Sequence, residues 1–178
     1  MGRFKIDNSA AGLASVRMNA GGAWRLVQLV RHLDDGGNHV LVETLRMAAE
    51  DWGIHPRTYQ RWLDRALELE LLYITGEHIR YKSTARTAEI LKASSISRAV
   101  FLREPERLFQ AGWIGVVWAC FLVSINRDDK PTSRETLEEL SGITTRQQRE
   151  YESKTDLAVV IPNYADRRKA PGRPLSPK

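Results

Sequence analysis

The chain has 178 residues, of which 42% are apolar, so it is long and apolar enough for one large or two small packed cores and is not a disordered chain. One cysteine, Cys120, excludes an intrachain disulfide framework and suits a reducing cytoplasm. The formal net charge is +5, but residues 166–178 hold five cations against one carboxylate. Four of the five excess charges therefore belong to this tail, and the net charge does not indicate a basic surface on the folded part.

The first expected helix covers residues 23–33, where Leu26, Leu29, Val30 and Leu33 recur at helical spacing. Residues 34–38 break this pattern, and residues 40–42 are expected to form a short strand. Residues 1–22 precede the first pattern and begin with a polar, charged stretch that is not a secretory signal. We interpret them as an N-terminal leader.

Two short amphipathic helices follow in residues 48–72, interrupted once at Gly53. A glycine between two helical patterns supplies the positive φ that reverses the chain without a Cβ clash. Pro56 fits the first position of the second helix, which leaves His55 as the N-cap. Histidine is a weaker cap than Ser, Thr, Asp or Asn.

The second of these helices has two distinct faces. Its apolar residues are expected to face a core, and they are Tyr59, Trp62, Leu63 and Leu67. The opposite face offers side chains suited to base edges, because Arg pairs bidentately with guanine and Gln with adenine. We assign base contacts to Arg57, Thr58, Gln60 and Arg61, and a DNA backbone contact to Arg65. The alternative is a surface helix that carries ordinary solvated charge.

A hairpin is expected after this helix. Residues 69–74 start a strand, Gly76 and Glu77 form the turn, and residues 78–82 alternate as a returning strand. Arg80 and Lys82 share one face and are assigned to the DNA backbone, where contacts position a protein without reading sequence. The alternative is a hairpin that only closes the domain.

The order helix, strand, helix, turn, helix, hairpin resembles the winged helix-turn-helix family of DNA-binding proteins over residues 23–83. The resemblance implies that the helix beginning at Pro56 enters the major groove and that the hairpin is the wing. Residues 84–104 are too apolar for a solvated spacer, and we interpret them as a linker of broken helix.

Residues 105–165 are interpreted as a weaker copy of the first unit. Pro105 is expected to open a long helix that runs to about Ile125, and its apolar run of 13 residues from Trp113 is short of the roughly 20 needed to cross a bilayer. After a loop, Thr132 or Ser133 is the candidate N-cap of the next helix, which ends at Gly142.

The chain then repeats the pattern of the first corner. Gly142-Ile143 matches Gly53-Ile54, and in both an arginine stands four residues after the glycine. We assign DNA contacts in this second unit to Thr145, Arg146, Gln147 and Arg149, and expect a strand in residues 157–161. The alternative is a small helical bundle that packs on the first unit and does not touch DNA.

The tail, residues 166–178, is rich in Pro, Gly and basic residues and is not expected to fold alone. Its Gly172-Arg173-Pro174 resembles an AT-hook, which implies minor-groove contacts by Arg168, Lys169 and Arg173. The alternative is a plain basic tail that adds nonspecific, salt-sensitive affinity.

The fold class expected is mainly α with small β-hairpin wings, in two winged-helix-like units joined by a helical linker. No enzyme, cofactor or metal is expected, because the four histidines lack metal-ligand spacing, there is no phosphate-cradling Gly-rich loop, and no nucleophile stands near a base in a recognisable motif.

The expected function is sequence-specific binding of double-stranded DNA in the cytoplasm, on the nucleoid. The tandem arrangement resembles transcriptional regulators and the replication initiator or accessory proteins of plasmids and phages. A homodimer, or other replication or transcription proteins, are the further partners considered, and no membrane is expected. The alternative function is a protein–protein adaptor in which only the basic tail contacts nucleic acid.

Overall fold

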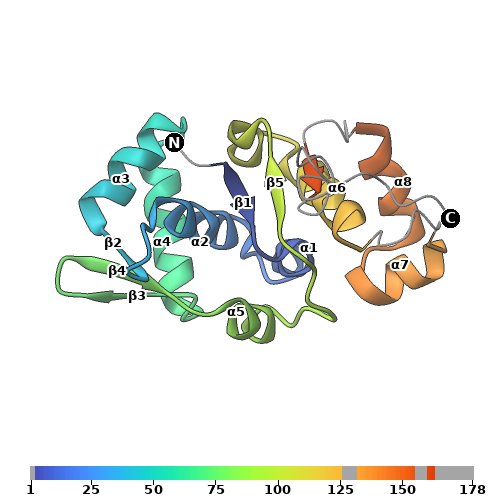
Figure 1. The fold of residues 1–178 in the computed structure, drawn as a ribbon, viewed down its shortest axis with the longest axis horizontal. Helices are drawn as coiled ribbons and strands as arrows, with labels where there is room; N and C mark the ends of the chain where they lie inside the picture. Colours follow the sequence, from blue (N-terminus) through green and yellow to red (C-terminus); the bar gives the residue numbers. More distant parts are fainter. Residues whose placement is uncertain (1–2, 126–131, 155–159, 163–178) are drawn as a thin grey trace, which may run out of the picture.

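A computed structural model describes residues 3–125, 132–154 and 160–162 of the chain. The fold is mainly helical, with two small three-stranded antiparallel sheets (Figure 1). The helices are α1 (Ser9–Arg17), α2 (Gly21–Leu33), α3 (Val42–Asp51), α4 (Pro56–Glu68), α5 (Thr84–Ile90), α6 (Trp113–Ile125), α7 (Arg134–Ser141) and α8 (Thr145–Lys154), with a 3-10 helix, η1 (Pro105–Phe109). The strands are β1 (Phe4–Ile6), β2 (His39–Leu41), β3 (Leu72–Thr75), β4 (His78–Tyr81), β5 (Val100–Leu102) and β6 (Val160–Pro162).

One sheet has the strand order β2-β4-β3 and packs beside α2, α3 and α4. Ile79 of β4 pairs with Val40 on one side and with Ile74 on the other, and its side chain is fully buried. The expected hairpin is therefore confirmed, with Gly76 at positive φ in its turn. The expected short strand is also present, although α3 already begins at Val42.

The corner between α3 and α4 has the geometry that the residues predict. Gly53 has a φ of +76°, and the Nδ1 atom of His55 accepts a hydrogen bond from the amide of Arg57 at 3.2 Å. Pro56 occupies the first turn of α4, where its missing N–H leaves no intrahelical bond unmade. The Ile54 side chain, between the two helices, is buried.

Most of the expected leader is part of the fold. β1 pairs with β5, and β5 pairs in turn with β6 to form the second sheet. α1 is buried along most of its length and packs against α2 and α6. Ser97, just before β5, bonds to the start of α1: its hydroxyl lies 2.8 Å from that of Ser9, and its amide donates to Asn8 Oδ1 at 3.2 Å.

The prediction of one continuous helix from Pro105 to Ile125 is wrong. Pro105 opens only the short helix η1, and Gln110 is extended. Gly112 then adopts a φ of +82°, a left-handed conformation that no α-helix continues through, and α6 starts at the next residue. The linker region is likewise not only broken helix, because it holds β5 as well as α5.

A single cluster of buried apolar side chains connects the two halves of the described chain. Its largest members include Trp24 of α2 and Trp118 and Phe121 of α6, all completely buried. Cys120 is also completely buried, and burial raises the pKa of its thiol. Within residues that the structure describes, no helix is both long and apolar enough to cross a membrane.

Candidate nucleic-acid interface

α4 presents one buried and one solvent-exposed face. Tyr59, Trp62 and Leu63 are buried and fix the helix on the core, as their spacing predicts. Arg57 and Arg61 are exposed, and within the described residues neither side chain makes a hydrogen bond or an ion pair. Their guanidinium groups are therefore free to bind an acceptor on another molecule.

The other expected contact residues of α4 are more constrained. Gln60 is exposed, and its amide donates to Asp64 Oδ1 at 2.7 Å. Thr58 is half-buried. Arg65 donates to the carbonyl of Met18 at 2.7 Å and forms an ion pair with Glu68 at 2.7 Å, which ties α4 to the end of α1. The side chains most available on this face are consequently those of the two unpaired arginines.

Arg80 of β4 and Lys82, just after β4, lie near each other beside Tyr73 of β3. Arg80 stands between His39 and Tyr73 in the register of the three strands, and Lys82 Nζ lies 4.8 Å from the centre of the Tyr73 ring. Both cations are half-buried. The rings of His39 and His78 meet beside them, with their centres 4.7 Å apart.

The acidic residues of α3 are largely neutralised within their own helix. Arg46 bonds to Glu43 and to Glu50, the latter at 2.6 Å. The hydrogen bond from Arg46 lowers the pKa of the Glu43 carboxyl, so both groups stay charged near neutral pH. Without Arg46, the carboxylates of Glu43 and Glu50 would repel an anionic ligand bound at the neighbouring helix α4. Their bonds to Arg46 reduce this repulsion.

α7 and α8 meet at a second glycine corner. Gly142 has a φ of +70° and caps α7, and Ile143 is buried as Ile54 is. Thr144 and Gln147 then form a reciprocal capping box: the Thr144 amide donates to Gln147 Oε1 at 3.1 Å, and the Gln147 amide donates to Thr144 Oγ1 at 3.4 Å. Ser133, one of the two expected caps, accepts from the Thr136 amide and starts α7.

The anchor of α8 is polar. Gln148 is completely buried, and its amide nitrogen donates to the carbonyls of Ile143 at 2.9 Å and Arg134 at 3.1 Å. Of the four expected contact residues, Arg146 and Arg149 are exposed. Gln147 is exposed but commits its carbonyl to the cap, and Thr145 bonds to Glu138 through its amide at 3.2 Å.

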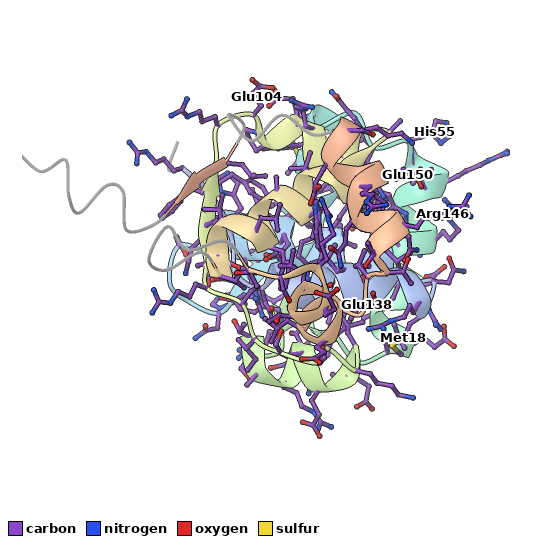
Figure 2. All side chains as sticks on the ribbon, turned by 90° about the vertical axis from the view of Figure 1, so that its right-hand side faces the viewer. Met18, His55, Glu104, Glu138, Arg146 and Glu150 are labelled. Atoms are coloured by element: carbon purple, nitrogen blue, oxygen red, sulfur yellow. The ribbon has the colours of Figure 1, made fainter. Side chains whose placement is uncertain are left out.

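The residues that begin α4 and α8, just after the two glycine corners, lie on the same side of the molecule. Figure 2 places His55, at the start of α4, and Arg146, at the start of α8, on one side, and Figure 1 separates the two helices along the longest axis. Met18, to which Arg65 bonds, lies on this side too. A long ligand running along this side could contact both helix starts.

Two arginines near this side were not assigned a role from the sequence. The guanidinium of Arg17, at the end of α1, lies against the second corner, because a Cβ on Gly142 would fall 2.2 Å from its Nη1 atom. Arg25 of α2 lies beneath α4, with its guanidinium carbon 4.2 Å from the centre of the Trp62 ring. Arg17 falls in the expected leader and Arg25 in a helix treated as core, so their positions follow only from tertiary contacts.

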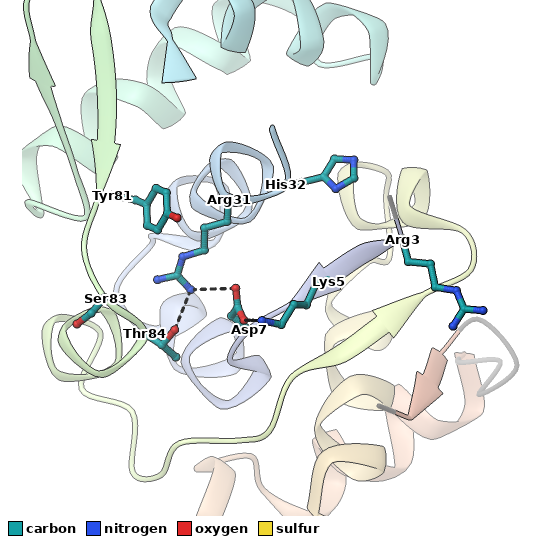
Figure 3. Close-up of a pocket in the computed structure, with 8 residues that line it drawn as sticks. All are labelled: Arg3, Lys5, Asp7, Arg31, His32, Tyr81, Ser83 and Thr84. Atoms are coloured by element: carbon teal, nitrogen blue, oxygen red, sulfur yellow. Dashed lines mark hydrogen bonds and ion pairs between the residues drawn. The ribbon is translucent and has the colours of Figure 1, made fainter. Parts of the chain in front are cut away.

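A hollow of about 500 Å³ lies between β1, α2 and the end of β4 (Figure 3). Its central Arg31 lies 3.6 Å from Asp7, and Lys5 lies 2.7 Å from the same carboxylate. Arg31 also donates to the Lys82 carbonyl at 2.8 Å. Asp7 and the Lys82 carbonyl both bind Arg31, so this cluster is a structural tie between the two sheets.

Several expectations lie outside the described residues. These are the tail cations Arg168, Lys169 and Arg173 and the part of the expected last strand that precedes Val160. β6 itself covers Val160–Pro162 and pairs with β5. Across residues 3–125 and 132–154, no three His, Cys, Asp or Glu side chains gather as a metal site would need.

The chain was compared with models of protein families, with curated proteins and with solved structures. None of the three comparisons found a match.

Proposed function

We propose that this protein binds double-stranded DNA with sequence preference and that α4 is its principal reading helix. The observation that carries the proposal is the pair of exposed, unpaired guanidinium groups of Arg57 and Arg61 on a helix held rigidly by Trp62 and Leu63. An unpaired arginine on a fixed helix matches the bidentate acceptor pattern of guanine in the major groove.

The elements around α4 support a winged-helix assignment. The order α2, β2, α3, α4, β3, β4, with the sheet order β2-β4-β3, is the arrangement expected for a helix-turn-helix followed by a wing. In this assignment Arg80 and Lys82 reach phosphates beside the groove, and they add affinity without reading bases.

α7 and α8 are proposed as a second helix-turn-helix that contacts the same DNA. The proposal rests on the repeated corner, with Gly142 and Ile143 in the places of Gly53 and Ile54, and on the exposure of Arg146 and Arg149. The location of His55 and Arg146 on the same side of the molecule supports a site in two parts along one duplex (Figure 2). The basic tail would then add salt-sensitive affinity.

The biological role proposed is regulation of transcription, or initiation of or assistance in replication of a plasmid or phage, on the nucleoid in the cytoplasm. This part of the proposal comes from the resemblance to tandem winged-helix proteins. Homodimers and other replication or transcription proteins are the further partners it includes.

The test replaces both unpaired arginines, Arg57→Ala with Arg61→Ala, and measures binding to duplexes selected from a random pool. Losing two bidentate contacts of about 1 to 3 kcal/mol each should weaken binding to the selected site at least about 30-fold. The matched control replaces two exposed arginines away from α4, Arg98→Ala with Arg103→Ala, and removes the same charge. The control should weaken binding only about as much as lost nonspecific attraction does, within roughly threefold. Equal losses in the two double variants would overturn the role of α4.

A protein–protein adaptor is the second candidate, and exposed apolar side chains on the sheet favour it. Leu41 and Tyr73 share one face of the sheet and are 45% and 40% exposed, Ile74 on the other face is 47% exposed, and Met47 of α3 is 55% exposed. Such side chains are typical of protein contacts when they gather on one surface. The same pair of double variants separates the two candidate functions. An adaptor that touches DNA only through its tail has no preference for a DNA sequence, so substitutions in α4 would weaken its DNA binding no more than the control substitutions do.

A further inference from the structure

A hollow of about 400 Å³ lies between the start of α2 and the inner edge of α4, lined by Gly21, Gly22, Arg25, Arg61 and Arg65. No carboxylate lines it within the part of the chain that the structure describes. The one acidic partner of these arginines is Glu68, which binds Arg65 from the exposed side at 2.7 Å. Three arginines thus line a space that has little compensating negative charge.

Arg25 is the unusual member of this group. Its side chain belongs to a residue only 9% exposed, yet it has no carboxylate partner among the described residues. Nε donates to the Gly21 carbonyl at 3.2 Å and Nη1 to the Leu108 carbonyl at 3.3 Å, while Nη2 has no hydrogen-bond partner in the described chain. Burying a charge without an opposite charge is costly, and here burial lowers the pKa of Arg25 to about 10.

Two indole rings hold Arg25 in place. Its guanidinium carbon lies 4.2 Å from the centre of the Trp62 ring and 4.4 Å from that of Trp113. The rings approach closely because α2 begins with two glycines: a Cβ on Gly22 would fall 2.1 Å from Trp62, and one on Gly21 would fall 2.6 Å from Trp113. These contacts stabilise the cation but do not neutralise it.

The first turn of α2 adds backbone donors to the same space. Ala20 occupies the N-cap position and offers no side-chain acceptor, and the first intrahelical bond starts at the Trp24 amide. The amides of Gly21, Gly22 and Ala23 therefore have no acceptor within the described residues. An open helix N-terminus attracts anions through these donors and the helix dipole.

We propose that this hollow, here called the α2 anion site, binds a phosphate group. A phosphate has enough acceptor oxygens to bond to the open amides, the free Nη2 of Arg25 and the guanidinium of Arg61 together. It also supplies the negative charge that is missing around the Arg25 cation. The phosphate belongs either to the backbone of a nucleic acid or to a free phosphorylated molecule. The site shares Arg61 with the proposed base contacts of α4, and one guanidinium cannot bind a base and this phosphate together, so the site is tested first without DNA.

The test is a titration of the full chain with inorganic phosphate at constant ionic strength, at about pH 8, where the phosphate dianion predominates. Nuclear magnetic resonance follows the amide signals of Gly21, Gly22 and Ala23. We expect these signals to shift and saturate. Arg61→Gln should weaken the binding about tenfold, as the loss of a charge-assisted hydrogen bond does.

The matched control is Arg57→Gln, which removes an exposed arginine one turn earlier in α4 that does not line the hollow. It should leave phosphate binding within about twofold. Shifts that grow linearly without saturation, or equal weakening in the two variants, would overturn the site. Both positions are exposed, so neither substitution threatens folding.

A second titration identifies the source of the phosphate. If a nucleic-acid backbone occupies the site, duplex DNA shifts the same three amide signals and displaces inorganic phosphate. If a free phosphorylated molecule occupies it, inorganic phosphate still binds to the DNA-bound protein. Failure of DNA binding would leave the phosphate titration unaffected, so the two proposals fail separately.

Discussion

The two corner glycines, Gly53 and Gly142, set the direction of the helices that carry the candidate contacts. Both adopt positive φ, but their surroundings differ. A Cβ at Gly53 would meet no atom within 4 Å, whereas a Cβ at Gly142 would collide with Arg17. Substitution at Gly53 therefore measures backbone strain alone, and substitution at Gly142 also displaces a cation from the second corner.

Gly53→Ala should lower the free energy of unfolding by about 1 to 2 kcal/mol, because alanine is strained in the left-handed region. Gly53→Asn should lose less, since asparagine tolerates this conformation. Chemical denaturation of the two variants and the unmodified chain measures the difference. If Gly53→Ala proved as stable as the unmodified chain, the corner would not have the φ described.

Cys120 gives a residue-scale test of the core. Its thiol is completely buried, and burial raises its pKa, so the reactive thiolate is scarce in the folded chain near pH 8. We expect a thiol reagent to label it rapidly only after unfolding in denaturant. Rapid stoichiometric labelling of the folded chain at that pH would place Cys120 outside the core.

Among the elements, α4 and α8 are held by different means. α4 is fixed by aromatic and aliphatic side chains, chiefly Trp62 and Leu63, and α8 by the hydrogen bonds of Gln148. A buried polar side chain such as Gln148 stabilises a helix only while all of its hydrogen bonds are made. Each buried carbonyl left without a donor is destabilising.

Gln148→Leu should therefore destabilise the chain by about 1 to 3 kcal/mol, since it removes the donors to two carbonyls and leaves them unsatisfied. Gln147→Leu is the matched control, as it makes the same chemical change at an exposed neighbour that serves only in the cap. It should cost about 1 kcal/mol or less. Thermal or denaturant unfolding compares the two, and a larger loss from Gln147→Leu would contradict the role given to Gln148.

Glycine, proline and capping residues in the sequence predicted the helix ends and turns that they themselves determine. Gly53 and Pro56 placed the start of α4, Gly76 the hairpin turn, and Ser133 and Gly142 the ends of α7. These residues act on the dihedral angles and hydrogen bonds of their own neighbours, so one sequence suffices to interpret them.

Long-range contacts were not predictable in this way. β1 pairs with β5, which lies more than ninety residues later in the sequence. A strand of three residues has too short a pattern to predict so distant a pairing. Arg25 likewise gains its surroundings from Trp62 and Trp113, which come from separate parts of the chain. The break at Gly112 was missed because the apolar pattern after it continues helical spacing.

At the scale of the whole molecule, one apolar cluster links the two corner-bearing halves. α1 lies at the junction, against α2 on one side and α6 and α7 on the other. The two candidate reading helices are thus fixed relative to one another, which favours a DNA site with constant spacing between its parts.

A shared core also predicts cooperative unfolding. Denaturation followed by circular dichroism and by tryptophan fluorescence should give one coincident transition, since neither half can lose its structure without exposing the cluster. Two separated transitions would mean that the halves are independent domains.

Selection of bound DNA from a random pool tests whether α4 and α8 read one duplex. We expect an enriched site in two parts at constant spacing. The pair Arg57→Ala with Arg61→Ala should abolish the preference for one part, and Arg146→Ala with Arg149→Ala the preference for the other. A pool that shows no enriched sequence after selection by the unmodified chain would contradict the claim.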